Sequence, residues 1–264
     1  MSNFYDDLQT KNVLLTGAFG ALGREISKAF AAQGANLLLV DHPSALDEGF
    51  METLYSSKSE ISFYPIDLEN QRELIEGLTA IKSKCPHIDV LINNAAFVGT
   101  SQGEGWNTTF ENQSLESWER ALRINLTAPF QLIQKLLPVL GGGKNSSIIN
   151  VSSIYGEFAP DWKIYEGTDM SNPAAYSASK GGLLQLTRWL STTLSPSIRI
   201  NAVSPGGILR NQHPKFVAAY VEKTPLGRMA TEADVVAAIL FLGSESSSYI
   251  TGQNIRVNGG WGLS

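Results

Sequence analysis

The chain has 264 residues, of which 17% are charged and 43% are hydrophobic, and its formal net charge is −5 at pH 7. This composition is typical of a globular protein with a hydrophobic core. The acidic balance, and the absence of any run of Lys and Arg, exclude a surface built to bind nucleic acid. No apolar run is long enough to span a membrane, so we expect no membrane partner either.

The chain has a single cysteine, Cys85, which excludes an intrachain disulfide. Its three histidines lie far apart in the sequence, and no spacing of Cys and His suits a metal, so we expect no metal site. The first seven residues carry acidic side chains where a secretory signal needs basic ones, which predicts a cytoplasmic protein.

Apolar, β-branched runs alternate with segments of helical periodicity along the whole chain. The predicted strands are Val13–Thr16, Asn36–Asp41, Ile61–Ile66, Val90–Ile92, Ile148–Val151, Arg199–Val203 and Asn254–Val257. The predicted helices are 21–33, 69–84, 115–137, 174–194 and 231–242, with a further short helix within 43–58. Short apolar strands separated by helices indicate an α/β fold, a doubly wound parallel sheet covered by helices on both faces.

Three segments interrupt this alternation. They are the Gly-rich stretch 97–114, the stretch 155–173 with its aromatic and acidic residues, and the irregular region 206–224. Each follows a predicted strand. Ligands of open α/β sheets bind beyond the carboxyl ends of the strands, so we expect the three segments to meet there and form the ligand site.

A glycine-rich turn, Thr16–Gly23, follows the first strand and opens the first helix. Glycines let the backbone approach a pyrophosphate without a Cβ clash, and the helix amino terminus offers free N–H groups to an anion. The same pattern also occurs as an ordinary turn between a strand and a helix. A carboxylate at the end of the second strand, Asp41, favours the dinucleotide interpretation, because it can accept hydrogen bonds from both ribose hydroxyls of adenosine.

Asp41 would also repel a 2′-phosphate, and no Lys or Arg adjoins it. The sequence therefore favours NAD, with NADP as the less favoured cofactor. The alternative interpretation of Asp41 is a solvated acid at the end of a strand.

Tyr176 and Lys180 are four residues apart at the start of a predicted helix, so both side chains can point into one site. We expect the ammonium of Lys180 to lower the pKa of the phenol, which would let Tyr176 exchange a proton with a carbonyl or alcohol oxygen. Ser153, at the end of the fifth strand, can hydrogen-bond the same oxygen. Asn125 lies in mid-helix, where Asn is unfavourable, and a functional duty such as ordering a water beside Lys180 would explain it. Taken singly, each residue also has a structural explanation as a surface, capping or turn residue.

Together these motifs resemble the short-chain dehydrogenase/reductase family over nearly the whole chain. The resemblance rests on Thr16–Gly23, Asp67-Leu68, Asn93–Ala96, Asn125, Ser152-Ser153, Tyr176–Lys180, Asn201–Gly206, Pro225–Arg228, Tyr249–Gln253 and Val257–Gly260. It implies an NAD(P)-dependent oxidoreductase that interconverts an alcohol and a carbonyl. It also implies that residues 1–264 form a single Rossmann-fold domain with seven parallel strands in the order 3-2-1-4-5-6-7.

The resemblance assigns site residues as well. It makes Asn125, Ser153, Tyr176 and Lys180 the catalytic tetrad, and lets Lys180 hold the nicotinamide ribose. Asp67 and Leu68 would bracket adenine, Asn93 and Ala95 would line the cofactor, and Pro205–Ile208 would contact nicotinamide. The residues expected to bind the cofactor are Gly17, Phe19, Gly20, Ala21, Leu22, Gly23, Asp41, Asp67, Leu68, Asn94, Ala95, Ala96, Tyr176, Lys180, Pro205, Gly206 and Ile208.

The sequence departs from the family pattern at three positions. Ala21 stands where the small enzymes have their second loop glycine, Ala96 replaces a glycine, and Arg210 replaces a threonine that often touches the carboxamide. The resulting Thr-Gly-x-x-Gly-x-x-Gly spacing is that of the sugar-nucleotide epimerase and dehydratase branch. Those enzymes have a larger substrate domain, which 264 residues hardly accommodate.

The segment between Ser153 and Tyr176 is about ten residues longer than is usual in the family. Carboxylates and amides bind hydroxyl groups and aromatic rings pack on sugar faces, so this segment favours a polar, sugar-like substrate over a steroid or an acyl chain. The expected substrate residues are Ser153, Phe97, Glu157, Trp162, Lys163 and Arg210, of which Lys163 or Arg210 would pair a phosphate or carboxylate. The segment is also similar to bacterial flagellin-modification and surface-sugar (nonulosonic acid) oxidoreductases. Its alternative interpretation is a solvated loop or a subunit contact.

Two rival functions stay open on the sequence. One is an epimerase or dehydratase that retains NAD through its cycle, and the other is a noncatalytic dinucleotide-binding regulator. The family resemblance further implies a homotetramer or homodimer formed through the helices at 115–137 and 174–194. We expect Trp189 to lie in the core or an interface, and Trp261–Ser264 to reach a neighbouring subunit.

Overall fold

The computed structural model describes residues 5–55, 59–98, 103–140 and 146–263. Residues 56–58 and 99–102 of the segments named above, and Ser264, lie outside the described residues.

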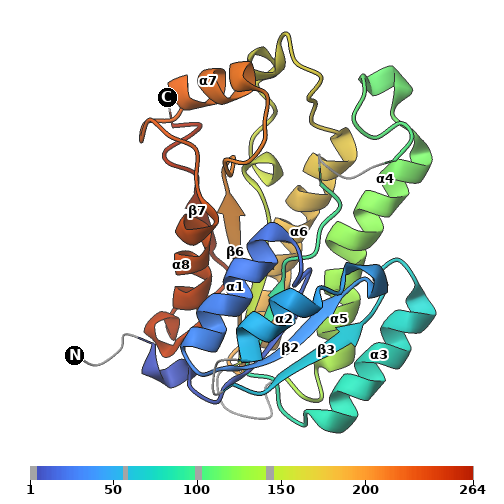
Figure 1. Cartoon of the computed structure of the whole chain (residues 1–264), viewed down its shortest axis with the longest axis vertical. Coiled ribbons are helices and arrows are strands. Elements are labelled where there is room, and N and C mark those ends of the chain that lie inside the picture. The colour runs from blue at the N-terminus through green and yellow to red at the C-terminus, as the bar shows by residue number, and fades with distance from the viewer. Residues whose placement is uncertain (1–4, 56–58, 99–102, 141–145, 264) are drawn as a thin grey trace.

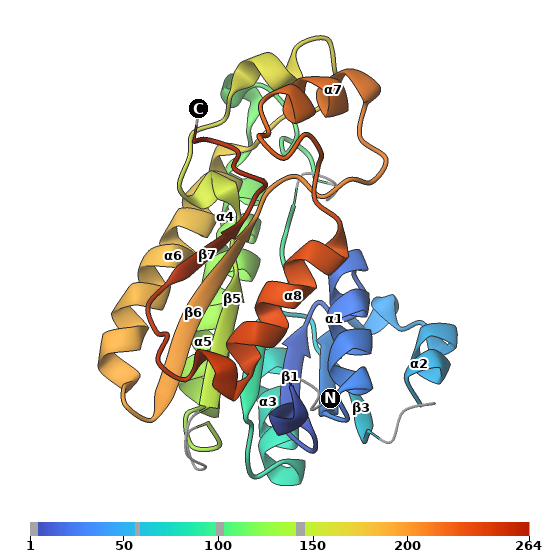
Figure 2. The same ribbon diagram turned by 90° about the vertical axis from the view of Figure 1, so that its left-hand side faces the viewer.

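Seven parallel strands form one sheet in the order β3-β2-β1-β4-β5-β6-β7, which confirms the predicted fold class (Figures 1 and 2). The strands are β1 (Asn12–Thr16), β2 (Asn36–Asp41), β3 (Ile61–Pro65), β4 (Val90–Asn93), β5 (Ser146–Val151), β6 (Ile198–Pro205) and β7 (Asn254–Val257). Every residue of β4, β5 and β6 is buried, whereas the edge strands β3 and β7 are largely accessible. Helices on both faces explain why the central strands β4 to β6 are buried along their whole length rather than at every second residue.

The helices are α1 (Ala21–Ala32), α2 (Glu48–Tyr55), α3 (Gln71–Lys84), α4 (Leu115–Leu122), α5 (Ala128–Leu136), α6 (Ala174–Leu194), α7 (Pro214–Glu222) and α8 (Glu232–Gly243). Apolar side chains of α1, α2 and α8 pack in one core cluster, and those of α3, α5 and α6 in a second on the other sheet face. Several helices begin where their sequence caps them. Asn70 accepts hydrogen bonds from the first N–H groups of α3, and Thr231 and Asp234 form a reciprocal capping box at α8.

Two elements differ from the sequence prediction. The helix expected at 115–137 is interrupted by a π-helical turn at Arg123–Thr127, between α4 and α5. The region 206–224, expected to be irregular, contains α7. Pro214 at the first turn of α7, and the buried Phe216 and Tyr220 four residues apart, are the signals that would have predicted this helix.

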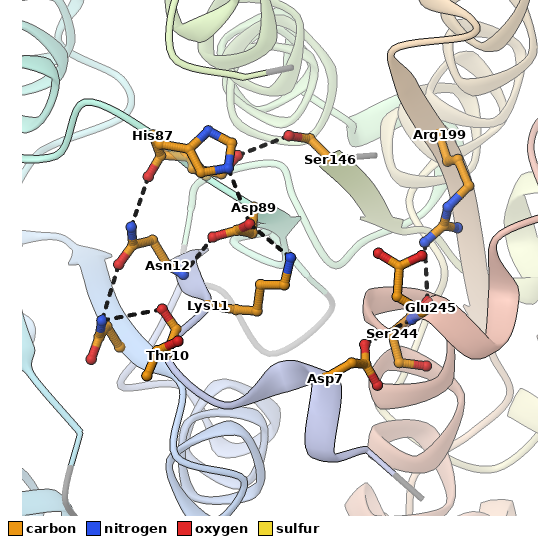
Figure 3. A network of polar contacts seen from close by, with 12 residues as sticks. Asp7, Thr10, Lys11, Asn12, His87, Asp89, Ser146, Arg199, Ser244 and Glu245 are labelled. Atoms are coloured by element: carbon orange, nitrogen blue, oxygen red, sulfur yellow. Dashed lines mark hydrogen bonds and ion pairs between the residues drawn. The ribbon is translucent and has the colours of Figure 1, made fainter. Parts of the chain in front are cut away.

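A polar network ties the amino-terminal edge of the sheet together (Figure 3). Asp89 accepts hydrogen bonds from Lys11 Nζ at 3.0 Å and from the Asn12 N–H at 2.9 Å, and its Oδ1 lies 3.0 Å from His87 Nε2. At the same edge the Arg199 guanidinium donates to the carbonyls of Leu242 and Ser244. These bonds hold the end of the sheet that lies away from α7 (Figure 2). Within the described part of the chain, no helix combines the length and the apolar character needed to cross a lipid bilayer.

Candidate active site

A cavity of about 1040 Å³ opens beyond the carboxyl ends of the strands. Its walls come from the turn after β1, from the residues that follow β2 to β6, and from α6. All three irregular segments predicted to meet at this edge contribute: Asn107 from the first, Asp169–Ser171 from the second, and Gly206, Ile208 and Arg210–His213 from the third.

Glycine is required at two positions of the turn at one end of the cavity. Gly17 has φ +67°, and a Cβ there would lie 2.8 Å from the Ala95 Cα. A Cβ on Gly23 would lie 2.0 Å from the Gly17 carbonyl oxygen. Helix α1 then begins at Ala21, with no capping hydrogen bond from any described side chain, so its first N–H groups face the cavity without a side-chain partner.

The carboxylate of Asp41 lies beside this turn and lines the cavity. It accepts hydrogen bonds from the Phe19 N–H and the His42 N–H, both at 2.8 Å. Phe19 contributes this backbone contact only, because its ring is buried against Phe50 and Phe63 in the core. The expected cofactor contact of Phe19 therefore does not involve its side chain.

The segment after β4 is bonded to the glycine-rich turn. Asn94 donates to the carbonyls of Thr16 and Gly17 at 3.1 and 3.0 Å, and the Thr16 hydroxyl accepts from the N–H groups of Asn94 and Ala95. Asn94, Ala95 and the substituted Ala96 line the cavity. Asn93 does not line it: it is buried and donates to Asn150 at 2.8 Å. The expectation that Asn93 would line the cofactor is therefore wrong, because its side chain projects from a face of the sheet toward Asn150, its register partner on β5, and not into the cavity.

The remaining predicted cofactor residues, Gly20, Leu22, Asp67, Leu68, Pro205, Gly206 and Ile208, also line the cavity. The sheet order separates their two groups. Asp41 ends β2 and Asp67 follows β3, while Ser153 follows β5 and Pro205 ends β6. Four strand intervals lie between β2 and β6, roughly 19 Å at the usual strand spacing. The cavity is therefore elongated across the sheet edge, with the amino terminus of α1 between its ends.

Tyr176, Lys180 and Ser153 line the other end of the cavity together. The Lys180 Nζ lies 5.8 Å from the centre of the Tyr176 ring and donates to the Val151 carbonyl at 2.8 Å. Ser153 accepts a hydrogen bond from the Tyr155 N–H at 3.2 Å, which fixes its side chain at the end of β5. The two helical side chains and the strand-end serine thus converge as the spacing predicted.

The titration behaviour of the pair differs from the expectation. Burial raises the pKa of Tyr176, although its hydrogen bond with Ser153 lowers it in part. Burial lowers the pKa of Lys180 to about 7, because almost no solvent reaches the amine. The predicted lowering of the Tyr176 pKa by a fully charged Lys180 is therefore wrong in this structure. Near neutral pH the phenol keeps its proton and the amine is partly neutral.

Asn125 lies in the π-helical turn and is 1% exposed. Its Oδ1 accepts from the Phe97 N–H at 2.7 Å, and its Nδ2 donates to the Phe97 carbonyl and to the Ser179 hydroxyl, both at 3.0 Å. The amide does not line the cavity but fixes the segment after β4 to the helix that carries Tyr176 and Lys180. π-turns of this kind are common at functional sites.

Four of the expected substrate residues lie away from the cavity. Phe97 is buried, with its ring 4.5 Å from that of Trp106. Glu157 accepts from Arg256 and Asn254 at 2.5 and 2.9 Å, which ties it to β7. Trp162 and Lys163 are exposed and do not line the cavity. A charge paired with a residue about a hundred positions away cannot be recognised from the local sequence.

Arg210 lines the cavity but its Nε donates to Glu232 at 2.9 Å, so it is not a free cation. Six further polar residues, which no sequence motif singled out, line the same cavity. These residues are Asn107, Asp169, Ser171, Asn211, Gln212 and His213.

The residues present fit a dinucleotide. One end of the cavity offers a carboxylate for ribose hydroxyls, the middle offers uncapped N–H groups beside glycines with no room for a Cβ, and the far end holds a proton-exchanging phenol. No group of three or more His, Cys, Asp or Glu residues suited to a metal occurs among the described residues. The site is that of a nicotinamide-dependent oxidoreductase.

Comparisons with known proteins agree with this class. A family profile described as enoyl-(acyl carrier protein) reductase matches residues 17–262. The chain belongs to the short-chain dehydrogenase/reductase family. A short-chain dehydrogenase from Leptospira borgpetersenii, solved with bound NAD+, is similar in structure: the TM-score is 0.85 at 33% identity, covering 99% of this chain and 96% of the other.

Two relatives with different names are similar over nearly their full lengths. The 7α-hydroxysteroid dehydrogenase of Bacteroides fragilis is 32% identical over 96% of this chain and 94% of its own. The post-translational flagellin modification protein A of Campylobacter coli is 28% identical over 97% of this chain and 100% of its own.

Proposed function

We propose that this chain is a single-domain, NAD-preferring dehydrogenase/reductase that interconverts an alcohol and a carbonyl on a sugar-like substrate, in surface-glycan or nonulosonic acid biosynthesis. The observation that carries the substrate class is a set of polar residues that line the same cavity as Tyr176, namely Asn107, Asp169, Ser171 and Gln212. Amides and carboxylates select hydroxyl groups, whereas a steroid or acyl chain needs an apolar wall. Similarity to the Campylobacter coli flagellin modification protein supports the same class.

The preference for NAD rests on Asp41. Its carboxylate lines the adenosine end of the cavity and is held there by two backbone N–H groups. A negative charge at this position binds ribose hydroxyls and repels a 2′-phosphate. The Leptospira borgpetersenii neighbour with its bound NAD+ is consistent with this preference.

A bound nicotinamide dinucleotide would supply or accept the hydride at the substrate carbon. In carbonyl reduction, the Tyr176 hydroxyl gives its proton to the substrate oxygen as the new C–H bond forms, and the Ser153 hydroxyl donates a hydrogen bond to that oxygen. The raised pKa of Tyr176 keeps the phenol protonated before this step. Lys180 donates to the Val151 carbonyl and orients its amine toward the tyrosine ring. Asn125 positions the segment after β4 against α6.

The direct test is a turnover assay on the purified protein. Its panel contains neutral aldoses, amino sugars, uronic acids and nucleotide-linked sugars, beside a hydroxysteroid and a 3-oxoacyl thioester. We expect NADH formation or consumption with one of the sugar classes. Turnover of the steroid or the thioester alone would contradict the proposed substrate class.

One observation supports the alternative function as an epimerase or dehydratase. It is the Thr-Gly-x-x-Gly-x-x-Gly spacing of Thr16–Gly23. Such an enzyme converts a nucleotide-linked sugar without net change in the absorbance of reduced nicotinamide. The same panel, analysed by mass spectrometry of the sugar, therefore separates the two chemistries.

We also propose that the protein assembles as a homotetramer or homodimer through α4, α5 and α6. These helices expose large apolar side chains, among them Leu115, Trp118, Phe130 and Trp189. Trp189 is 59% exposed, so the alternative that it lies in the core is wrong. Of the segment Trp261–Ser264, the Trp261 side chain is buried against tyrosines of its own chain, so the expected subunit contact cannot be made by Trp261; for the exposed Leu263 it stays part of the proposal.

A further inference from the structure

The hydroxyl of Tyr220, in α7, accepts a hydrogen bond from the Gly207 N–H at 2.7 Å. Gly207 belongs to the short segment Pro205–Ile208, whose residues Pro205, Gly206 and Ile208 line the cavity together with Tyr176 and Ser153. Tyr220 itself does not line the cavity. Tyr220 therefore contacts the segment Pro205–Ile208 on the side that faces away from the cavity.

The other hydrogen bonds of Gly206 and Gly207 come from backbone groups, whereas the carbonyl of the next residue, Ile208, accepts a hydrogen bond from Gln212 Nε2 at 2.6 Å. The Gly206 N–H donates to the Val257 carbonyl at 2.9 Å, and the Ala230 N–H donates to the Gly207 carbonyl at 2.9 Å. Among the described side chains, only that of Tyr220 hydrogen-bonds the backbone of Gly206 or Gly207. Tyr220 is thus the one described side chain that hydrogen-bonds the backbone of these two glycines, through the Gly207 N–H.

The ring of Tyr220 also explains why both positions are glycine. A Cβ on Gly206 would lie 2.7 Å from the Tyr220 hydroxyl oxygen. A Cβ on Gly207 would lie 2.7 Å from the Met229 Cε and 3.1 Å from the Tyr220 Cζ. The tyrosine fills the space behind the segment, so the segment cannot retreat from the cavity.

Tyr220 is itself held firmly. Its ring is 2% exposed and stacks on that of Trp261, with the ring centres 5.9 Å apart and the planes at 11°. Phe216 lies on α7 beside it, at 5.8 Å between ring centres. This aromatic cluster also contains Tyr155 and Tyr165, whose hydroxyls are 2.6 Å apart.

We propose that Tyr220 is a positioning residue that holds Pro205–Ile208 against the nicotinamide half of the bound dinucleotide. The end of the cavity where this segment lies is the one that contains Tyr176, and hydride transfer requires the nicotinamide ring to be there. The adenosine half lies near Asp41, on the other side of β1 in the sheet, and is beyond the reach of Tyr220. The proposal rests only on binding of a nicotinamide dinucleotide and holds for any substrate.

The test compares two ligands on the Tyr220→Phe variant. ADP-ribose contains every part of NADH except the nicotinamide, so the proposal predicts a selective effect. We expect the dissociation constant of NADH, measured by isothermal titration, to rise by roughly 3- to 10-fold, the usual worth of one hydrogen bond. The constant for ADP-ribose should stay within about twofold of the wild-type value.

Tyr165→Phe is the matched control, because it removes a buried hydroxyl from the same aromatic cluster without touching Gly207. It should leave the ratio of the two constants unchanged. An equal change in both constants for Tyr220→Phe, or no change in either, would overturn the proposal. If the wild type binds neither ADP-ribose nor NADH, the titration is repeated with NADPH and 2′-phospho-ADP-ribose. Failure to bind any of the four ligands would count against dinucleotide binding itself, not against the role of Tyr220.

A second measurement uses the wild-type protein and does not depend on the folding of a variant. Hydrogen exchange of the Gly207 amide should slow further with NADH than with ADP-ribose at saturation, because only NADH contacts this segment through nicotinamide. Equal protection by both ligands would contradict the proposal.

Discussion

Lys180 carries a titratable amine in a place where it is almost completely shielded from water. Its pKa is lowered to about 7 from the ordinary 10.5, so burial of its charge opposes folding. Below pH 7 both the folded and the unfolded chain carry the charge, and the whole cost is present. Between pH 7 and 10.5 the folded chain has lost the proton that the unfolded chain retains, so this cost fades as the pH rises.

We therefore predict that Lys180→Met abolishes turnover but raises the free energy of unfolding below pH 7. Removal of the buried charge contributes ~3–5 kcal/mol to this increase, and the Val151 carbonyl left without its donor reduces it by about 1 kcal/mol. The gain should shrink toward pH 10. Urea unfolding of both proteins across this range is the measurement. A variant less stable than the wild type at pH 6 would show that the buried charge of Lys180 does not destabilise the folded protein.

Asp41→Asn tests the charge at the adenosine end of the cavity. A hydrogen bond to a charged group is worth about 1.5–3 kcal/mol, so the KM for NAD+ should rise roughly tenfold or more, while that for NADP+ falls or stays level. Asp47→Asn is the control, since Asp47 pairs with Arg24 and does not line the cavity. An unchanged ratio of the two cofactor constants would refute the assigned preference.

The last residues of the segment between β5 and α6 line the cavity, where the proposed sugar-like substrate would contact them. We predict that Asp169→Asn raises the KM for the sugar substrate at least several-fold, because a carboxylate that accepts hydroxyl hydrogen bonds is lost. Lys163→Ala should leave the KM unchanged, since Lys163 belongs to the same segment but does not line the cavity. Steady-state kinetics of both variants gives the two KM values. Equal changes in KM would contradict a substrate contact at Asp169.

The order and type of the elements could be predicted because the physical signals are local. The buried runs 148–151 and 199–203 are strands in the structure, and the capping residues mark helix starts. Asn125 stood out as an unfavourable residue in mid-helix, and the structure places it in a π-turn. Tyr176 and Lys180 converge because a spacing of four residues places side chains on one helix face.

The directions of the side chains in the irregular stretches 97–114 and 155–173 could not be predicted from the sequence. Glu157 pairs with Arg256 and Asn254, which are adjacent to it only in the folded chain. Phe97 faces Trp106 inside the protein rather than the substrate. The lowered pKa of Lys180 likewise depends on how completely the surrounding elements exclude water, which no local pattern encodes.

At the scale of the whole molecule, the proposed assembly depends on the exposed apolar side chains of α4 to α6. Burying a large side chain in an interface contributes about 1.5–3 kcal/mol, and replacing it with a charge adds a desolvation cost. We predict that Trp189→Glu shifts the protein to smaller species in sedimentation velocity, while Tyr249→Glu, at a fully exposed site on another element, does not. A wild-type protein that sediments as a monomer would contradict the assembly.

In the proposed reaction, the phenol of Tyr176 exchanges a proton with the substrate oxygen while a hydride moves to or from nicotinamide. The rate of NADH formation or consumption by Tyr176→Phe, with the sugar that the panel identifies, tests it most directly. Acid–base catalysis by one side chain is typically worth ~10²–10⁴-fold, so kcat should fall by that factor, while the dissociation constant of NADH changes far less because the ring of residue 176 is kept. A variant that keeps the wild-type kcat would contradict the account.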